Sequence, residues 1–185
     1  MSNPIDLLLS RKSHNKLISP APTEEQLEVM FKAALRAPDH ALLKPWRFRV
    51  FEGEALEQLG EHFVEAAKHD QADLTEEKLA KLRSKPLRAP MVIVASVVIK
   101  EHPKVPEIEQ VLSGGASVQN LIMAAHFQGV GAMWRTGGMA FSRKLMSLLG
   151  FEAQETLIGF IYLGTEEGEK RQARVSEIEE HVTRI

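Results

Sequence analysis

The sequence predicts a domain of mixed helices and strands, α/β or α+β, built around one sheet that is covered on both faces. Two continuous apolar runs, Met91–Ile99 and Thr156–Leu163, indicate strands buried on both faces, because half-exposed strands alternate apolar and polar residues instead. Amphipathic helical patterns are interleaved with these runs. The chain has 185 residues and no repeat, so we expect residues 1–185 to form a single domain.

The N-terminal half is expected to hold helices on either side of one strand. Thr23 and Gln26 fit a capping box at a helix start. That helix should end near Arg36–His40, because the residue before a proline leaves helical geometry. In chain order we expect a helix over Pro4–Leu9, a linker over Ser19–Pro22, a helix from Thr23, a period-two strand over Pro45–Phe51, and helices over Glu54–Lys68 and Thr75–Lys85, joined by a turn at His69–Asp70.

The C-terminal half is expected to hold three strands and two helices. The expected order is a central strand over Met91–Ile99, a polar loop over Glu101–Pro106, a helix from Ser113 or from as early as Pro106, a strand over Ala132–Trp134, a helix over Ser142–Leu149 closed by Gly150, and a strand over Thr156–Leu163. The charged tail from Gly164 onward is expected to run extended over the surface.

Two adjacent glycines, Gly114 and Gly115, lie inside the helix that follows the polar loop. A glycine in a helix interior costs roughly 1 kcal/mol relative to alanine. The pair therefore indicates that something approaches this backbone closely. The candidates are another helix, a second subunit or a flat cofactor.

Composition and motifs exclude several classes of protein. A net charge of -2 and scattered basic residues argue against nucleic acid and anionic membranes as partners. The absence of cysteine excludes disulfides and thiolate sites, and the seven histidines lack zinc-site spacing, so no metal is expected. No signal peptide is apparent, and the longest apolar run falls far short of the roughly 20 residues of a membrane-spanning helix. We therefore expect a cytoplasmic protein.

The glycine motifs of nucleotide-binding and hydrolytic enzymes are also missing. Gly129–Trp134 begins like a dinucleotide fingerprint, but it lacks the third glycine and follows a helix rather than a strand. The sequence contains no Walker A motif and no G-x-S-x-G elbow. These observations disfavour hydrolases, kinases and zinc enzymes.

Three short cationic clusters lie at the ends of predicted elements, with no acidic residue beside them that would be an evident partner. They are Arg11–Ser13, Arg36–His40 and Trp134–Gly138. Each has an ordinary structural explanation: cations complement a helix C-terminus, Asp39 caps a turn, and a strand ending in Gly-Gly turns. Together they also provide the arginine forks, hydroxyls and backbone amides that bind phosphate.

The order and spacing of these clusters resemble the nitroreductase family along nearly the whole chain. The matching features are Leu8–Ser13, Arg36–His40 with Pro45–Phe48, and Gln128–Gly137. The resemblance implies an α+β fold, with a mixed central sheet flanked by helices, and an intertwined, obligate homodimer. It also implies two FMN molecules in clefts at the subunit interface.

The resemblance also implies roles for individual residues. Arg11, Lys12 and Ser13 would contact the phosphate, ribityl chain and flavin edge of FMN. Arg36 and His40 would reach the FMN held by the other subunit, and Trp134, Arg135 and Thr136 would complete its phosphate end. A segment assigned to NAD(P) would comprise Ala124, Ala125, His126, Phe127, Gln128 and Gly129. Lys12 stands where the family usually has a second arginine, which removes a bidentate fork from the site.

The implied activity is an FMN-dependent oxidoreductase. NADH or NADPH would supply hydride, and a nitroaromatic, quinone or similar small electron-poor acceptor would be reduced by a ping-pong mechanism. The flavin would carry the chemistry without a protein nucleophile, and Lys12 would stabilise its reduced form. Alternatives are enoate reduction, dehalogenation or flavin fragmentation on the same fold, and a non-catalytic FMN-binding module. The acceptor would depend on cleft loops such as Glu101–Pro106.

Overall fold

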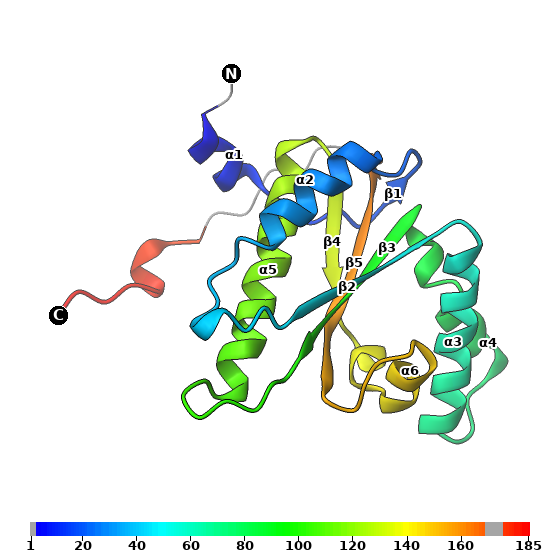
Figure 1. Ribbon diagram of the computed structural model, residues 1–185. Helices are drawn as coiled ribbons and strands as arrows, with labels where there is room; N and C mark the ends of the chain where they lie inside the picture. The colour runs from blue at the N-terminus through cyan, green and yellow to red at the C-terminus, as the bar shows by residue number, and fades with distance from the viewer. Residues whose placement is uncertain (1–2, 169–175) are drawn as a thin grey trace.

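The computed structural model describes residues 3–168 and 176–185 and shows a five-stranded sheet between two layers of helices (Figure 1). The helices are α1 (Pro4–Ser10), α2 (Glu24–Ala34), α3 (Glu54–Asp70), α4 (Glu76–Arg83), α5 (Glu107–Phe127) and α6 (Arg143–Leu148). The strands are β1 (Leu17–Ile18), β2 (Trp46–Glu52), β3 (Met91–Val98), β4 (Gly131–Arg135) and β5 (Glu155–Glu166). Helices α2 and α5 cover one face of the sheet, and α3, α4 and α6 lie on the other side (Figure 1).

The α+β class is confirmed, but the strand directions differ from those of the expected mixed sheet. Strand β5 pairs with β1, β3 and β4, and β3 also pairs with β2; every pairing in the described residues is antiparallel. Strands β3 and β4 both run antiparallel to β5 and are therefore parallel to each other. Because β5 lies between them, these two parallel strands are not neighbours.

Strand β3 has the covered, central position that its sequence predicts. Residues Met91, Ile93 and Ala95 belong to the core formed with α2 and α5. Val92 and Val94 belong to the core formed with α3 and α6. This alternation between two apolar cores explains why the run shows no polar alternation.

The two glycines of α5 have different surroundings. A Cβ atom on Gly114 would collide with the side chains of Val97 and Ile158, so this glycine allows α5 to lie close to β3 and β5 of its own chain. A Cβ atom on Gly115 would meet only Trp134, at 3.9 Å from its Cη2 atom. The close approach at Gly114 is thus made by the sheet, which was not among the expected candidates.

Most helix boundaries are confirmed. The Thr23 capping box is present, because the Gln26 backbone N–H donates to the Thr23 hydroxyl and the Thr23 N–H donates to the Gln26 side chain. Helix α5 begins at Glu107, which confirms the earlier of its two predicted starts. Helix α3 continues through His69 and Asp70, where we expected a turn.

The strands near the chain ends differ more from expectation. Strand β1 was not predicted, and it pairs Leu17 with Glu166 at the end of β5. Buried Gly164 lies within β5, so the prediction of an extended surface tail from this residue is wrong at its start. Residues 169–175 of that predicted tail lie outside the described residues.

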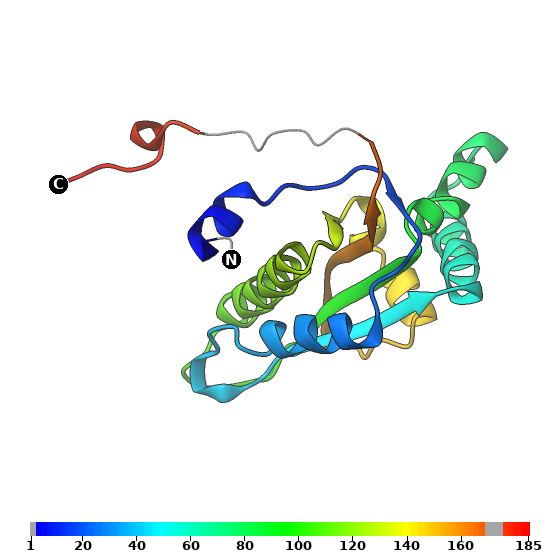
Figure 2. The same ribbon diagram turned by 90° about the horizontal axis from the view of Figure 1, so that it is seen from above.

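The N-terminal helix and the C-terminal segment project from the same side of the molecule. Figure 2 shows α1 and residues 176–185 on the side of α5, away from α3 and α4. Helix α1 has no buried residue, and its Ile5, Leu8 and Leu9 side chains are exposed. Within the described ranges, no helix combines the length and apolar character required to cross a membrane.

Candidate functional site

The N-terminal cationic cluster lies beside β4. The His14 backbone N–H donates to the Ala132 carbonyl at 3.0 Å, which places this segment against the strand that ends in Arg135. Lys12, Ser13 and His14 line a depression of about 440 Å³ together with residues at the end of β5. The structure therefore brings two of the three predicted clusters to the same strand.

The Glu166 carboxylate, at the end of β5, lies beside the basic side chains that line this depression. Lys12 Nζ lies 3.8 Å from one Glu166 oxygen, and His14 Nε2 lies 3.2 Å from the other. The expectation that these cations lack an acidic partner is therefore wrong for Lys12. Glu166 lies more than 150 residues away in the chain, and only the strand register brings it here.

The side chain of His14 is only 8% exposed beside Glu166. Burial lowers the pKa of His14, and the charges of Lys12, His126 and Arg11 lower it further, against the opposing effect of Glu166. Glu166 therefore lies beside two basic side chains, and the protonated form of one of them, His14, is disfavoured.

The end of α5 adds His126 to this cluster. The His126 Nε2 atom lies 3.1 Å from the Ser10 hydroxyl at the end of α1. The other residues predicted for NAD(P) binding differ in their exposure to solvent. Ala124 and Ala125 are buried in the core, whereas Phe127 and Gly129 are exposed. The Gln128 side chain donates to the carbonyls of Gln26 and Ala124. Only part of this segment is available to a ligand in the isolated chain.

The side chains of Trp134 and Arg135 point to opposite faces of the sheet. Trp134 packs on the α5 side, where its Nε1–H donates to the Ile158 carbonyl at 3.4 Å. The Arg135 guanidinium lies on the other side, 5.7 Å from the centroid of the Tyr162 ring. Arg135 and exposed Thr136 line a second depression, of about 380 Å³. Their alternation means that these two side chains do not converge on one phosphate.

His40 lies at the opposite end of α5, and Arg36 lies nearer the middle of that helix, because the flanking Ala34 and Pro38 carbonyls accept from Ser117 and Ser113. His40 Nδ1 is 2.6 Å from a Glu109 oxygen in the first turns of α5, and Arg36 is exposed. Glu109 and His126 are 17 positions apart on α5, which corresponds to about 26 Å at 1.5 Å per residue. Within one chain, His40 is therefore well separated from the cluster around Lys12.

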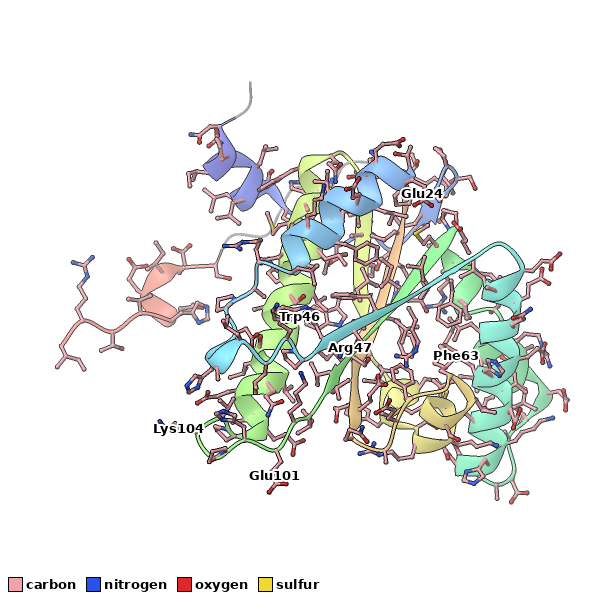
Figure 3. The ribbon with its side chains drawn as sticks, viewed as in Figure 1. Glu24, Trp46, Arg47, Phe63, Glu101 and Lys104 are labelled. Carbon is pink, nitrogen blue, oxygen red and sulfur yellow. The ribbon has the colours of Figure 1, made fainter. Side chains whose placement is uncertain are left out.

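The polar loop over Glu101–Pro106 also lies at that end of α5. Figure 3 labels Glu101 and Lys104 in this loop, beyond the first turn of the helix. The loop lines a depression of about 560 Å³ with Arg143 and Gln154. In the isolated chain, this predicted substrate loop is thus remote from Lys12 and nearer to His40.

Comparison with known proteins identifies the family. Residues 8–165 match the model of the nitroreductase family. A Haemophilus influenzae protein named "Putative NAD(P)H nitroreductase" is 42% identical over 183 residues, which cover 97% of each chain. The crystal structure of a nitroreductase-like family protein from Bacillus cereus covers the whole chain and 97% of its own, with a TM-score of 0.84 and 22% identity.

A nitroreductase from Bacteroides fragilis, crystallised with bound FMN, has the same fold. It superposes over 100% of both chains with a TM-score of 0.75 at 17% identity. The family match extends over most of the chain and includes the segments that carry Lys12, Arg36 and Arg135. The chain belongs to the nitroreductase family.

Proposed function

We propose that the protein is an FMN-dependent oxidoreductase that takes hydride from NADH or NADPH and reduces nitroaromatics, quinones or similar acceptors. The observation that carries the proposal is the placement of Arg11, Lys12 and Ser13 against the edge of β4. The family membership of the chain and the FMN bound by the Bacteroides fragilis protein support the choice of cofactor.

The donor groups of the N-terminal segment fit a phosphate-bearing cofactor. Among the described residues, Arg11 has no carboxylate partner, and the backbone N–H groups of Lys12 and Ser13 donate to no protein group. A guanidinium, an ammonium, a hydroxyl and free backbone amides are the donors that phosphate oxygens prefer. The segment therefore offers several unsatisfied donors to one anion.

When bound, FMN would supply the hydride-transfer chemistry that no side chain here can perform. Arg11 and Ser13 would hold its anionic end, and Lys12 would stabilise negative charge on the cofactor. Glu166 keeps Lys12 in position and offsets part of its charge. The exposed edge of β4 leaves backbone groups of Trp134 and Thr136 available to orient the cofactor.

The proposed assembly is a homodimer formed through α5. The outward face of α5 carries Ile108, Leu112, Gly115, Ala116, Gln119 and Phe127, with large apolar side chains at both ends and small ones in the middle. Ile108 and Leu112 are about 60% exposed, which is unusual for apolar residues aligned on one helix face. Small residues at the centre allow two copies of α5 to cross closely.

A twofold axis near the middle of α5 would complete the cofactor site. In an antiparallel pair, the first turns of one α5 lie beside the last turns of the other. Arg36 and His40 of one copy would then face Arg11 and Lys12 of its partner. This arrangement removes the separation along α5 of about 26 Å between Glu109, which contacts His40, and His126, which lies at the Lys12 end.

The visible spectrum of the purified protein tests the cofactor and the activity. A yellow protein that NADH or NADPH bleaches without oxygen, and that nitrofurazone or a quinone reoxidises, is the expected result. A colourless protein that takes up no added FMN contradicts the proposal. A yellow protein that neither reductant bleaches would instead identify a non-catalytic FMN-binding module.

A further inference from the structure

A second cluster of cations lies on the sheet face opposite α5. Lys85, Arg88 and Arg135 line a pocket of about 380 Å³ with Phe63, Phe160 and Tyr162, which we call the cationic pocket. Phe63, labelled in Figure 3, extends from α3 toward the sheet, where its ring meets Phe160 edge-on at 5.2 Å between centroids. The pocket thus combines aromatic walls with three positive charges.

These charges form no ion pair in the described part of the chain, although Arg88 also lines a neighbouring depression with Glu167, which pairs with Lys16. No carboxylate lines the cationic pocket, and Lys85, Arg88 and Arg135 form no ion pair with a described residue. Cations nearby on α4 behave differently, since Arg83 is bound by Glu61 and Lys81 by Glu77. The three cations of the pocket therefore differ from these two neighbours on α4, whose charges are paired.

The positive charges of the pocket influence the pKa values of Lys85 and Tyr162. Burial lowers the pKa of Lys85, and the charge of Arg88 lowers it further. Burial raises the pKa of the Tyr162 phenol, while the charges of Arg135 and Arg88 act in the opposite direction. Like charges gathered in a partly desolvated pocket repel each other, and a bound anion would relieve that repulsion.

We propose that the cationic pocket binds a phosphate or carboxylate group of a small ligand. The two guanidinium groups offer planar forks to the anion, Lys85 adds an ammonium, and the neutral Tyr162 hydroxyl adds a further donor. The aromatic walls accept the flat or apolar part of the same ligand. Thr136 and Gly137 line the pocket and connect it to the β4 edge at the proposed FMN site.

The anion has three possible sources, and the choice among them rests on the proposed function. They are the phosphate of FMN, the 2′-phosphate of NADPH, and a carboxylate on the acceptor. Each is a charged group on a flat aromatic molecule, which matches the composition of the pocket.

Tyr162 is the only tyrosine in the chain and provides a direct probe. Protein labelled with 3-fluorotyrosine should give one fluorine NMR signal, which should shift saturably with inorganic phosphate but not with chloride at equal ionic strength. The shift should disappear in Lys85→Gln/Arg88→Gln and persist in Lys81→Gln, whose lysine pairs with Glu77. No shift in the wild type, or the same shift in a folded double variant, would overturn the proposal. This result requires no flavin, so it stands even if the proposed function fails.

Steady-state and binding measurements on the holoenzyme then identify the source. The double variant should weaken the binding of one ligand by about tenfold or more relative to the counterpart that lacks the anionic group in question, as expected for losing charged hydrogen bonds. The pairs to compare are FMN with riboflavin, NADPH with NADH, and 4-nitrobenzoate with 4-nitrobenzyl alcohol. A double variant that binds all six ligands like the wild type would overturn the assignment of this pocket to a ligand.

Discussion

At the residue scale, Lys12 shares Glu166 with His14, so part of its charge is neutralised before any ligand binds. An arginine at this position would add a second donor for phosphate while still reaching Glu166. Lys12→Ala should therefore weaken FMN binding by about tenfold, and Lys12→Arg should bind FMN at least as tightly as the wild type. Fluorescence titration of apoprotein measures both.

Lys16→Ala is the matched control for this prediction. Lys16 lies in the same segment, is largely exposed, and contacts Glu167 at 3.6 Å. An FMN affinity that falls equally in Lys16→Ala and Lys12→Ala would indicate a general charge effect. Unchanged affinity in Lys12→Ala would remove Lys12 from the site.

A partly buried ion pair between Arg49 and Glu155 fixes the start of β5. Both oxygens of Glu155, which is 4% exposed, accept from Arg49 at 3.1 and 3.2 Å, and one also accepts from the Ser96 hydroxyl at 2.8 Å. Burial raises the pKa of Glu155, but the hydrogen bonds from Arg49, Ser96 and the Glu152 backbone outweigh it and lower the pKa below the ordinary 4.5.

Glu155→Gln should destabilise the fold by roughly 2–3 kcal/mol at pH 7, because it leaves Arg49 without its partner. The folded pKa lies below that of the unfolded chain, so the carboxylate stabilises the fold above pH 4.5 and loses this effect as pH falls through the folded pKa. The difference between wild type and variant in urea unfolding should therefore shrink in acid. Glu61→Gln, at an exposed pair with Arg83, should change stability much less.

At the scale of elements, the two adjacent glycines of α5 have different neighbours. Gly114→Ala should reduce the free energy of unfolding by about 1–3 kcal/mol, because the added methyl group overpacks the contact with β3 and β5. Gly138→Ala, where no atom lies within 4 Å of the added carbon, is the control. Urea unfolding of the three proteins measures the difference.

Gly115→Leu should act on assembly instead of on packing within the chain. The only atom within 4 Å of a Cβ added at Gly115 is Cη2 of Trp134, at 3.9 Å, and the position lies at the proposed crossing of two α5 helices. We expect a folded monomer by sedimentation, with FMN affinity reduced together with dimerisation. A variant that remains dimeric, or a monomer that still holds FMN tightly, would separate the two properties.

The elements that sequence could predict are those with strong local signals. The β-branched run at Met91–Ile99 and the capping box at Thr23 depend on neighbouring residues, and both are confirmed. Strand β1 has only two residues, and its pairing with Glu166 comes from the far end of the chain. The same pairing supplies the partner of Lys12, so the local sequence could not predict it.

At the scale of the whole molecule, the positions of the predicted site residues depend on long-range geometry. Sequence motifs selected Lys12, His40 and Arg135, but the length of α5 separates the first two, and strand alternation turns Arg135 away from Trp134. Lys85 and Arg88 belong to no motif and were missed for that reason. They lie close to Arg135 only in the folded protein, because the segment between α4 and β3 packs beside the end of β4.

Pairing two defective variants can determine whether each FMN site uses both chains. In a twofold dimer, one variant lacking Arg11 and Lys12 and another lacking Arg36 and His40, each by replacement with alanine, should bind FMN poorly as homodimers. Co-expressed heterodimers, purified through two different tags, contain one site with both clusters intact and one with neither. They should therefore bind about one FMN per dimer, half the wild-type amount. If each site were built within one chain, every site in the heterodimer would lack one cluster. Bound FMN would then remain as low as in the parent variants, and the antiparallel crossing of α5 would be wrong.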